Sequence, residues 1–252
     1  MAEMGIPHPG ISAIDQSGHS AYNVSDQIGH YSGFAIKTRK QVAVIYRKFY
    51  SLDPQKQQRI IHAAMEEFVR SGYEKASTNE IVKNAGISKG SLFQYFKSKK
   101  DLYLFLYEES SKAIEQIYEA MDWNETDLFE RLRKLGLTKL EIFRKYPLAI
   151  DFIRAFTLED AAEVKAEIEQ KNKQVMERGF KKLYENIDWS KFRKDIDLGA
   201  AMQVLNWTML GFAEQQRKKL PAIEEVDENS LGDWERYFHL LKTCFYQSNQ
   251  GG

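Results

Sequence analysis

Residues 77–104 read STNEIVKNAGISKGSLFQYFKSKKDLYL, and the pattern within this stretch decides the fold class. Ser77 and Glu80 have the spacing of a capping box, which predicts the start of a short helix. Gly86 follows that helix and predicts a tight turn, because glycine adopts a positive φ at low cost. Ser88 then has the position of an N-cap for a second helix. The stretch therefore predicts two short helices joined by a turn.

Two short helices joined by a turn that contains glycine are the skeleton of a helix-turn-helix. Small Ala85 would let the helices cross closely, and Ile87 would fill the space beneath the turn. The residues predicted to face inward with Phe68 of the preceding helix are Ile81, Leu92 and Phe96, and Phe93 is also interpreted as core. The residues predicted to face outward on the second helix are Lys89, Gly90, Ser91, Gln94 and Tyr95. That outer face is free to enter a DNA major groove, which is about 12 Å wide.

Longer helices are predicted on both sides of this motif. Asp53 and Pro54 have the N-cap and first helical positions of a helix that ends at Ser71-Gly72. Its apolar residues at helical spacing are Ile60, Ile61, Ala64, Phe68 and Val69. Ser98 and Asp101 predict the cap of the helix that follows the motif. The apolar stripe of that helix consists of Leu102, Phe105, Leu106, Ile114, Ile117 and Met121.

The remaining sequence predicts further helices at 126–145, 147–158, 160–185, 197–218 and 230–247. No segment has the alternation of apolar and polar residues that strands require. The predicted fold class is all-α, with an N-terminal three-helix domain and a C-terminal helical domain. The predicted divisions are a flexible leader or N-terminal extension at 1–50, the helix-turn-helix domain at 51–97 and the second domain at 98–248.

Charge is distributed unevenly along the chain, although the net charge is zero. Residues 54–101 contain nine Lys and Arg against five Asp and Glu, whereas residues 102–252 contain 22 against 27. A positive segment beside a negative remainder is typical of a module that binds a polyanion. In the leader, Lys37, Arg39 and Lys40 form either a basic arm that reaches DNA or a solvated tail, and residues 41–50 are apolar enough to order locally.

Composition argues against several classes of protein. No apolar run approaches the roughly 18 residues that a membrane span needs, and the N-terminus lacks the features of a secretory signal. The single cysteine, Cys244, excludes an intramolecular disulfide framework and fits a reducing compartment, so the predicted location is the cytoplasm. The five histidines lack metal-ligand spacing, and no catalytic constellation is visible. The sequence therefore predicts no metal, no cofactor and no enzyme.

Residues 77–104 closely resemble the DNA-binding signature of the TetR family. The residues that carry the resemblance are Thr78, Ala85-Gly86-Ile87-Ser88, Lys89-Gly90-Ser91, Phe93, Tyr95-Phe96 and Lys99-Lys100-Asp101-Leu102. Val82 stands where the family more often has Ala, and Phe93 replaces a frequent Tyr, which removes one possible hydroxyl contact. The resemblance implies a homodimeric repressor that binds a palindromic operator through residues 51–97. It also implies that a small molecule entering residues 98–248 releases the DNA.

The predicted DNA contacts follow from this resemblance together with side-chain chemistry. Thr78 and Tyr95 would donate hydroxyl hydrogen bonds to phosphates, and Lys89 and Lys99 would pair with phosphates directly. Gln94 would read a base edge, because its amide pairs bidentately with adenine, or would touch only phosphate or water. The full predicted set is Thr78, Ser88, Lys89, Gly90, Ser91, Gln94, Tyr95, Lys97 and Lys99.

The C-terminal region predicts a dimer interface and a ligand site. The helices at 197–218 and 230–247 have wide apolar surfaces, which form either an intrachain core or, as the resemblance favours, an interface with a second copy. The residues predicted to bind a hydrophobic ligand are Phe152, Phe156, Met176, Phe180, Trp207 and Met209, with plain core as the other interpretation. An activator, or a regulator controlled by a protein partner, is the main alternative function. A purely structural helical protein would not explain the positive segment.

Overall fold

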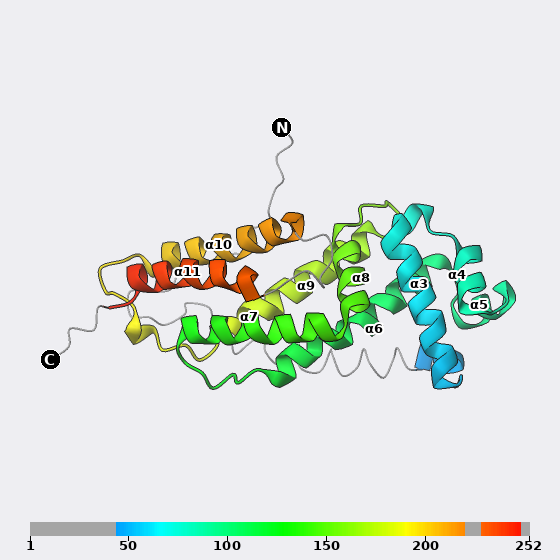
Figure 1. Ribbon diagram of the computed structural model, residues 1–252, viewed down its shortest axis with the longest axis horizontal. Coiled ribbons are helices and arrows are strands. Elements are labelled where there is room, and N and C mark those ends of the chain that lie inside the picture. The colour runs from blue at the N-terminus through cyan, green and yellow to red at the C-terminus, as the bar shows by residue number, and fades with distance from the viewer. Residues whose placement is uncertain (1–43, 220–227, 248–252) are drawn as a thin grey trace.

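The computed structural model describes residues 44–219 and 228–247, which form an elongated helical molecule (Figure 1). Its elements are α2 (Arg47–Tyr50), α3 (Pro54–Lys75), α4 (Thr78–Ala85), α5 (Lys89–Tyr95), α6 (Lys99–Ala120), α7 (Leu128–Lys145), α8 (Pro147–Leu158), α9 (Lys165–Tyr184), the 3₁₀ turn η1 (Trp189–Lys191), α10 (Leu198–Lys219) and α11 (Glu228–Phe245). Within these residues the only β pairing is an isolated bridge between Phe192 and Tyr246. The prediction of an all-α fold is confirmed. None of the described helices has a stretch long and apolar enough to cross a membrane.

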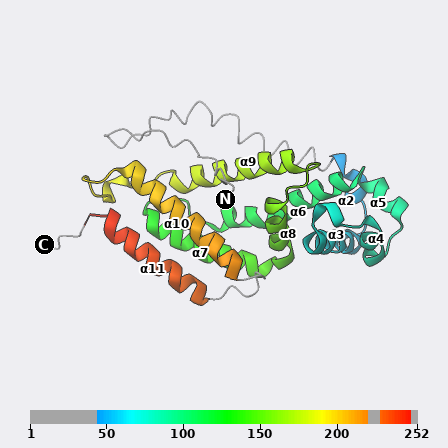
Figure 2. The same ribbon diagram turned by 90° about the horizontal axis from the view of Figure 1, so that it is seen from above.

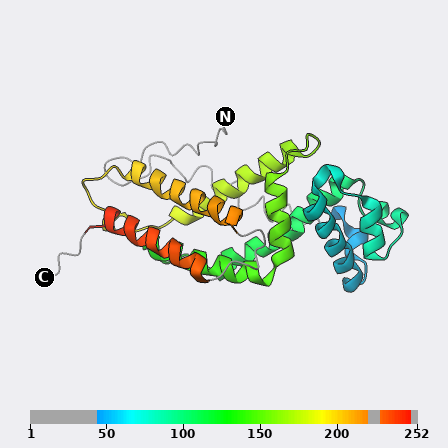
Figure 3. The same cartoon turned by 45° about the horizontal axis from the view of Figure 1, so that its top comes forward.

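The helices are arranged along the long axis of the molecule. The helices α3, α4 and α5 lie at one end, and α10 and α11 lie at the other (Figure 2). Figure 3 shows α10 and α11 running side by side. The helix α6 leads from the first end toward the second, so it connects the helix-turn-helix to the rest of the chain.

Short-range side-chain caps fix where several helices begin, as the sequence predicts. Asp53 Oδ1 accepts hydrogen bonds from the amides of Gln55 and Lys56 at 3.0 and 3.3 Å. Ser88 and Ser98 cap α5 and α6, each accepting from the amide three residues later. Each cap satisfies an amide that has no partner inside its own helix.

The predicted capping box at the start of α4 is only half right. Ser77 Oγ accepts from the amide of Glu80 at 3.4 Å, as expected. The return bond comes from another residue, because the Ser77 amide donates to Glu67 Oε1 of α3 at 2.9 Å. Glu80 lies instead 3.8 Å from Lys83 Nζ. A buried carboxylate on the preceding helix therefore replaces the local partner.

One apolar cluster contains buried residues from α2, α3, α4 and α5. It also includes the first half of α6, α8 and the start of α9. Its aromatic members are Tyr46, Phe49, Phe68, Tyr73, Phe96, Tyr103, Phe105, Tyr107, Phe152 and Phe156. The cluster continues across residue 97, so the predicted division between 97 and 98 does not separate two cores. We name it the first cluster.

Two details of the sequence prediction concern buried positions. Residues 41–50 are predicted to be apolar enough to order locally, and the described part of them agrees, because Tyr46 and Phe49 are buried in the first cluster; residues 1–43, with their basic run, lie outside the described residues. Phe93 is interpreted as core from the sequence but is 41% exposed. Phe93 lies about 100° around α5 from the buried Leu92, so it falls off the inward face.

Two further clusters hold the rest of the molecule. The second cluster joins α7, the end of α9, α10 and α11, and its buried members are Leu128, Phe129, Leu132, Leu183, Ile187, Phe192, Ala201, Met202, Leu205 and Phe238. The third cluster lies between α6, α7 and α8, and its buried members are Ala113, Ile117, Met121, Ile142 and Ile150. The C-terminal region is therefore built around two cores of its own.

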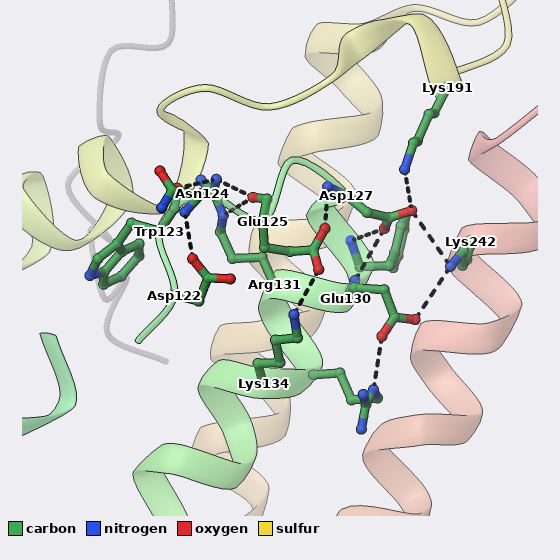
Figure 4. Close-up of polar contacts among 12 residues, drawn as sticks. Asp122, Trp123, Asn124, Glu125, Asp127, Glu130, Arg131, Lys134, Lys191 and Lys242 are labelled. Carbon is green, nitrogen blue, oxygen red and sulfur yellow. Dashed lines mark hydrogen bonds and ion pairs between the residues drawn. The ribbon is translucent and has the colours of Figure 1, made fainter. Parts of the chain in front are cut away.

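Arg131 of α7 is fully buried and forms hydrogen bonds with several backbone carbonyls at the end of the molecule that contains α10 and α11, which we call the far end (Figure 4). Its Nε donates to the carbonyl of Glu125 at 2.9 Å, and its Nη2 donates to the carbonyl of Trp123 at 3.1 Å. Its Nη1 donates to the carbonyls of Leu183 and Glu185 at 2.9 and 2.5 Å. Burial lowers the pKa of Arg131. The guanidinium joins the loop before α7 to the C-terminal end of α9.

Asp127, the N-cap of α7, lies at the centre of a neighbouring set of polar contacts (Figure 4). Its Oδ1 accepts from the amide of Phe129 at 3.0 Å and from the hydroxyl of Tyr246 at 3.1 Å. Its Oδ2 lies 3.0 Å from Lys191 Nζ and 3.8 Å from Lys242 Nζ. Burial opposes ionisation, but these donors hold the pKa of Asp127 below its usual value. One carboxylate thus connects α7, η1 and α11.

Candidate nucleic-acid interface

The turn between α4 and α5 has the geometry that the sequence predicts. Gly86 has φ 67° and ψ 39°, in the left-handed region that favours glycine. The amides of Gly86 and Ile87 donate to the carbonyls of Lys83 and Val82 at 3.2 and 3.0 Å. No described atom lies within 4 Å of where a Cβ on Gly86 would stand, so the backbone conformation alone requires glycine.

The helix α5 has one buried side and one open side. Leu92, and Phe96 at its C-terminal end, are each 1% exposed and anchor it from within. Five predicted contact residues are exposed, namely Ser88, Lys89, Gly90, Gln94 and Lys97. A short helix with an exposed amide and two exposed cations can place a base-reading group between two phosphate-binding groups.

The threonine and the two serines of the predicted set lie at helix starts. Thr78 is half-buried at the first position of α4. Ser88 Oγ accepts from the amide of Ser91 at 3.1 Å and lies 2.9 Å from Ser91 Oγ. Both serines therefore complete the N-terminus of α5. Any contact that these residues make with DNA stays a prediction.

Tyr95 is turned further inward than the sequence predicts. The residue is half-buried, and its ring packs edge-on against Phe49 and Phe96, with centroid distances of 6.2 and 6.5 Å. Its hydroxyl makes no hydrogen bond with the residues that the structure describes. The ring is thus part of the core, and the phosphate contact of the hydroxyl stays a prediction.

Lys99 has a structural role that the sequence does not predict, and its phosphate contact stays a prediction. Its Nζ donates to the carbonyls of Tyr73 and Glu74 at 2.8 and 3.0 Å, and lies 3.5 Å from the carbonyl of Ala76. The same ammonium stands 4.7 Å from the centroid of the Tyr73 ring. Cations at a helix C-terminus satisfy carbonyls that have no partner within the helix. Lys99 therefore caps the end of α3.

The corner between α3 and α4 is also held from the C-terminal region. Gly72 has φ 67° and ψ 173°, which interrupts the regular helix. The amide of the next residue, Tyr73, donates to Glu159 Oε2 at 2.7 Å, and Glu159 directly follows α8. Lys100 at the start of α6 lies 2.7 Å from Glu167 of α9. Sequence reasoning missed Glu159, and no local pattern could have revealed a partner 86 residues away.

The helix-turn-helix is the part of the chain that known proteins share. A family model described as bacterial regulatory proteins, tetR family, matches residues 60–105, from within α3 to the start of α6. The uncharacterized HTH-type transcriptional regulator YvkB of Bacillus subtilis (strain 168) is 32% identical over 120 residues, which is 47% of this chain and 62% of that protein. Residues 60–105 therefore resemble the DNA-binding region of TetR-family regulators.

Two further comparisons relate the chain to TetR-type proteins. The fatty acid metabolism regulator protein of the same Bacillus strain is 37% identical over 54 residues, 21% of this chain and 28% of that protein. The crystal structure of a TetR family transcriptional regulator from Chloroflexus aurantiacus J-10-FL has a TM-score of 0.56 and 22% identity, and the match covers 80% of this chain and 98% of that one. At this identity the structural likeness shows the fold alone. The chain aligns with less than two thirds of the length of either curated relative.

The residues predicted to form one ligand site do not come together. The predicted set is Phe152, Phe156, Met176, Phe180, Trp207 and Met209. Phe152 and Phe156 are fully buried in the first cluster, beside α3 and α6. Met176 and Trp207 are 43% and 57% exposed, and the remaining two pack against the second cluster. The prediction fails because α8, α9 and α10 turn these residues toward different cores.

Proposed function

We propose that this chain is a DNA-binding transcriptional repressor whose helix α5 enters the major groove of a palindromic operator. The observation that carries the proposal is the two-sided character of α5. Its buried side is fixed by Leu92 and Phe96, and its open side presents Lys89, Gln94 and Lys97. Gln94 would read a base edge and the lysines would bind phosphates. Such a regulator acts on chromosomal DNA in the cytoplasm.

A homodimer through α10 and α11 is part of this proposal. Large apolar side chains are exposed on these two helices, namely Val204, Trp207, Leu210, Tyr237 and Leu240. An exposed apolar patch of this kind marks an interaction surface. One short helix reads few base pairs, whereas a two-fold dimer places two copies of α5 on the two halves of a palindrome.

Release by a small hydrophobic ligand completes the proposed mechanism. The similarity of 54 residues to a fatty acid metabolism regulator supports this part of the proposal. We call α3, α4 and α5 the reading head. A ligand that displaces α6 would also displace the reading head, because Lys99 at the start of α6 binds the end of α3 and Lys100 pairs with α9. The distance between the two copies of α5 would then no longer fit successive major grooves.

The DNA-binding proposal is tested by selecting bound duplexes from a random library and measuring their affinity. We expect a palindromic site, at which Gln94→Ala costs about 1–3 kcal/mol and relaxes the preference at one position. Lys97→Ala should weaken binding to all sequences alike and reduce the salt slope by about 1. Lys181→Ala, an exposed lysine near the end of α9, is the matched control and should change neither. No preference for any duplex at low salt would refute the proposal.

The dimer and the ligand need separate measurements. Trp207→Glu should convert the dimer to monomer in sedimentation and weaken binding to the full palindrome more than to a half-site. A thermal-shift screen with fatty acids, acyl thioesters and cationic drugs should identify a compound that also releases the duplex. In a reporter assay, a signal that rises with the protein would identify an activator. Release only by another protein would favour the partner-controlled alternative.

A further inference from the structure

The segment α2 lies outside the residues that the family model matches, yet it touches the helix that we propose reads DNA. The match begins at residue 60, whereas α2 spans Arg47–Tyr50. Figure 2 shows α2 beside α5 and the start of α6. The residues of α2 therefore lie outside the matched segment, although the side chains that they contact lie within it.

The helix α5 depends on its neighbours for stability. It has only seven residues, and within them only Leu92 is buried. A helix of this length is marginal in isolation, so its position is set by the elements packed against it. In the described structure these are mainly α4 and α2. The helix α4 is joined to α5 by the turn at the N-terminal end of α5. The C-terminal half of α5 therefore depends on α2 for its packing.

Phe49 makes the apolar contact between α2 and α5. Its side chain is fully buried, and its ring centroid lies 6.2 Å from that of Tyr95 in an edge-on arrangement. The same ring lies 5.2 Å from Phe96 and 5.0 Å from Phe105. Edge-on ring pairs hold a specific relative orientation. Phe49 therefore fixes how Tyr95, a predicted phosphate contact, is turned.

A polar bridge connects α2 to the residue that follows α5 and its cap. Tyr46 donates its hydroxyl hydrogen to Asp101 Oδ1 at 2.5 Å, and Asp101 Oδ2 accepts from the amide of Lys97 at 2.8 Å. Tyr50 donates to Glu109 Oε1 of α6 at 2.6 Å. Burial together with these carboxylates raises the pKa of both tyrosines, so each stays a donor. The apolar contacts of Phe49 and the hydrogen bonds of Tyr46 and Tyr50 therefore join the α2 segment both to the C-terminal end of α5 and to α6.

We propose that α2 is a working part of the DNA-reading module and that Phe49 is a positioning residue for α5. The proposal rests on the proposed DNA-binding function but goes beyond the matched domain. Phe49 acts through Tyr95 and not by touching DNA. A substitution of Phe49 should therefore disturb α5 more than its effect on global stability requires, and it should weaken DNA binding by way of Tyr95.

The first experiment needs no DNA and compares amide hydrogen exchange in the full chain. We expect Phe49→Leu to speed exchange of the amides of residues 92–96 by about tenfold relative to the rest of the first cluster. Phe68→Leu is the matched control, because Phe68 is equally buried in the same cluster and its ring contacts are with Tyr73, Tyr103 and Phe152. The two variants are compared at equal global stability, measured by urea unfolding. Equal exchange in α5 would overturn the proposal.

The second experiment is a double-mutant cycle on duplex affinity, with the selected duplex as the probe. Phe49→Leu should weaken binding about tenfold in the natural chain but only about twofold when Tyr95 is already Ala. Equal losses in both backgrounds would mean that Phe49 does not act through Tyr95, and would overturn the proposal. If the natural chain binds no duplex, the proposed function fails, whereas the exchange experiment still decides whether α2 positions α5.

Discussion

The two ends of the molecule hold their helices by different means. Around α3, α4 and α5 the buried side chains are mainly aromatic and aliphatic, with Glu67 of α3 as a buried carboxylate among them. At the far end the guanidinium of Arg131 and the carboxylate of Asp127 lie inside and bond several elements at once. Apolar packing tolerates small shifts, whereas a buried ion needs each of its partners in place. A single substitution of a buried charged residue at the far end should therefore lower the free energy of unfolding more than a single substitution in the apolar core around α3, α4 and α5.

The largest effect is expected from Arg131→Met. The change leaves the carbonyls of Trp123, Glu125, Leu183 and Glu185 without their donor, so the free energy of unfolding should fall by about 3–5 kcal/mol in urea.

The matched control for this change is Arg133→Met, two residues along the same helix. Arg133 is 45% exposed in its side chain and, among the described residues, forms an ion pair with Glu130. Its loss should change stability by no more than about 0.5 kcal/mol. Equal losses from the two substitutions would contradict the comparison.

Asp127→Asn should lower the stability at neutral pH by about 1–3 kcal/mol, because the amide keeps the helix cap but loses the pairing with Lys191 and Lys242. The pKa of Asp127 is lowered by folding, so its ionised form stabilises the folded chain above the usual pKa of about 3.9. That stabilisation is lost as the pH falls through the lower folded pKa. Unfolding at pH 7, 5 and 3 should show a gap between variant and natural chain that closes in acid. A gap of constant size would refute this role.

Glu159→Ala tests whether the reading head also depends on a polar contact from outside. It leaves the amide of Tyr73 without an acceptor, which should cost about 1–2 kcal/mol and speed exchange of that amide. Asp160→Ala, the exposed neighbour, is the control and should stay within about 0.5 kcal/mol. If both variants exchange alike at Tyr73, the contact does not hold the corner.

The smallest effect is expected at the glycines of the helix-turn-helix. Gly86→Ala should cost about 1 kcal/mol, because the added Cβ meets no atom but the left-handed backbone is strained. Gly90→Ala lies in a regular helix with its Cβ position 3.9 Å from Ser88 Oγ, so it should gain up to about 1 kcal/mol of stability. Thermal unfolding of the two variants measures both changes in stability. If both changes had the same sign, the different backbone roles of Gly86 and Gly90 would be contradicted.

The features that could be predicted from the sequence are those that depend on interactions between residues close together in the chain. The caps at Asp53, Ser88 and Ser98 and the turn at Gly86 depend on neighbours within four residues, so their spacing is visible in the sequence. The exposed face of α5 followed from the same periodicity, except at Phe93 and Tyr95, because a seven-residue helix gives too few positions to define its buried side.

The contacts that the sequence did not reveal join residues far apart in the chain. Arg131 reaches carbonyls more than 50 residues away, and its isolated position in an amphipathic helix resembles that of any surface arginine. The ligand prediction failed for the same reason: Phe152 and Trp207 are both apolar and aromatic, and only the packing of α8 and α10 shows that one is buried and the other exposed.

The hydrogen bonds at the α3–α4 corner carry a consequence for any dissection of this chain. Lys99 and Glu159 satisfy backbone groups of Tyr73, but both lie beyond residue 97. A fragment cut at the motif boundary would lose both side chains and could not fold autonomously into the same corner. Chimaeras that exchange reading heads between relatives would have to carry the start of α6 and the segment after α8 along with them.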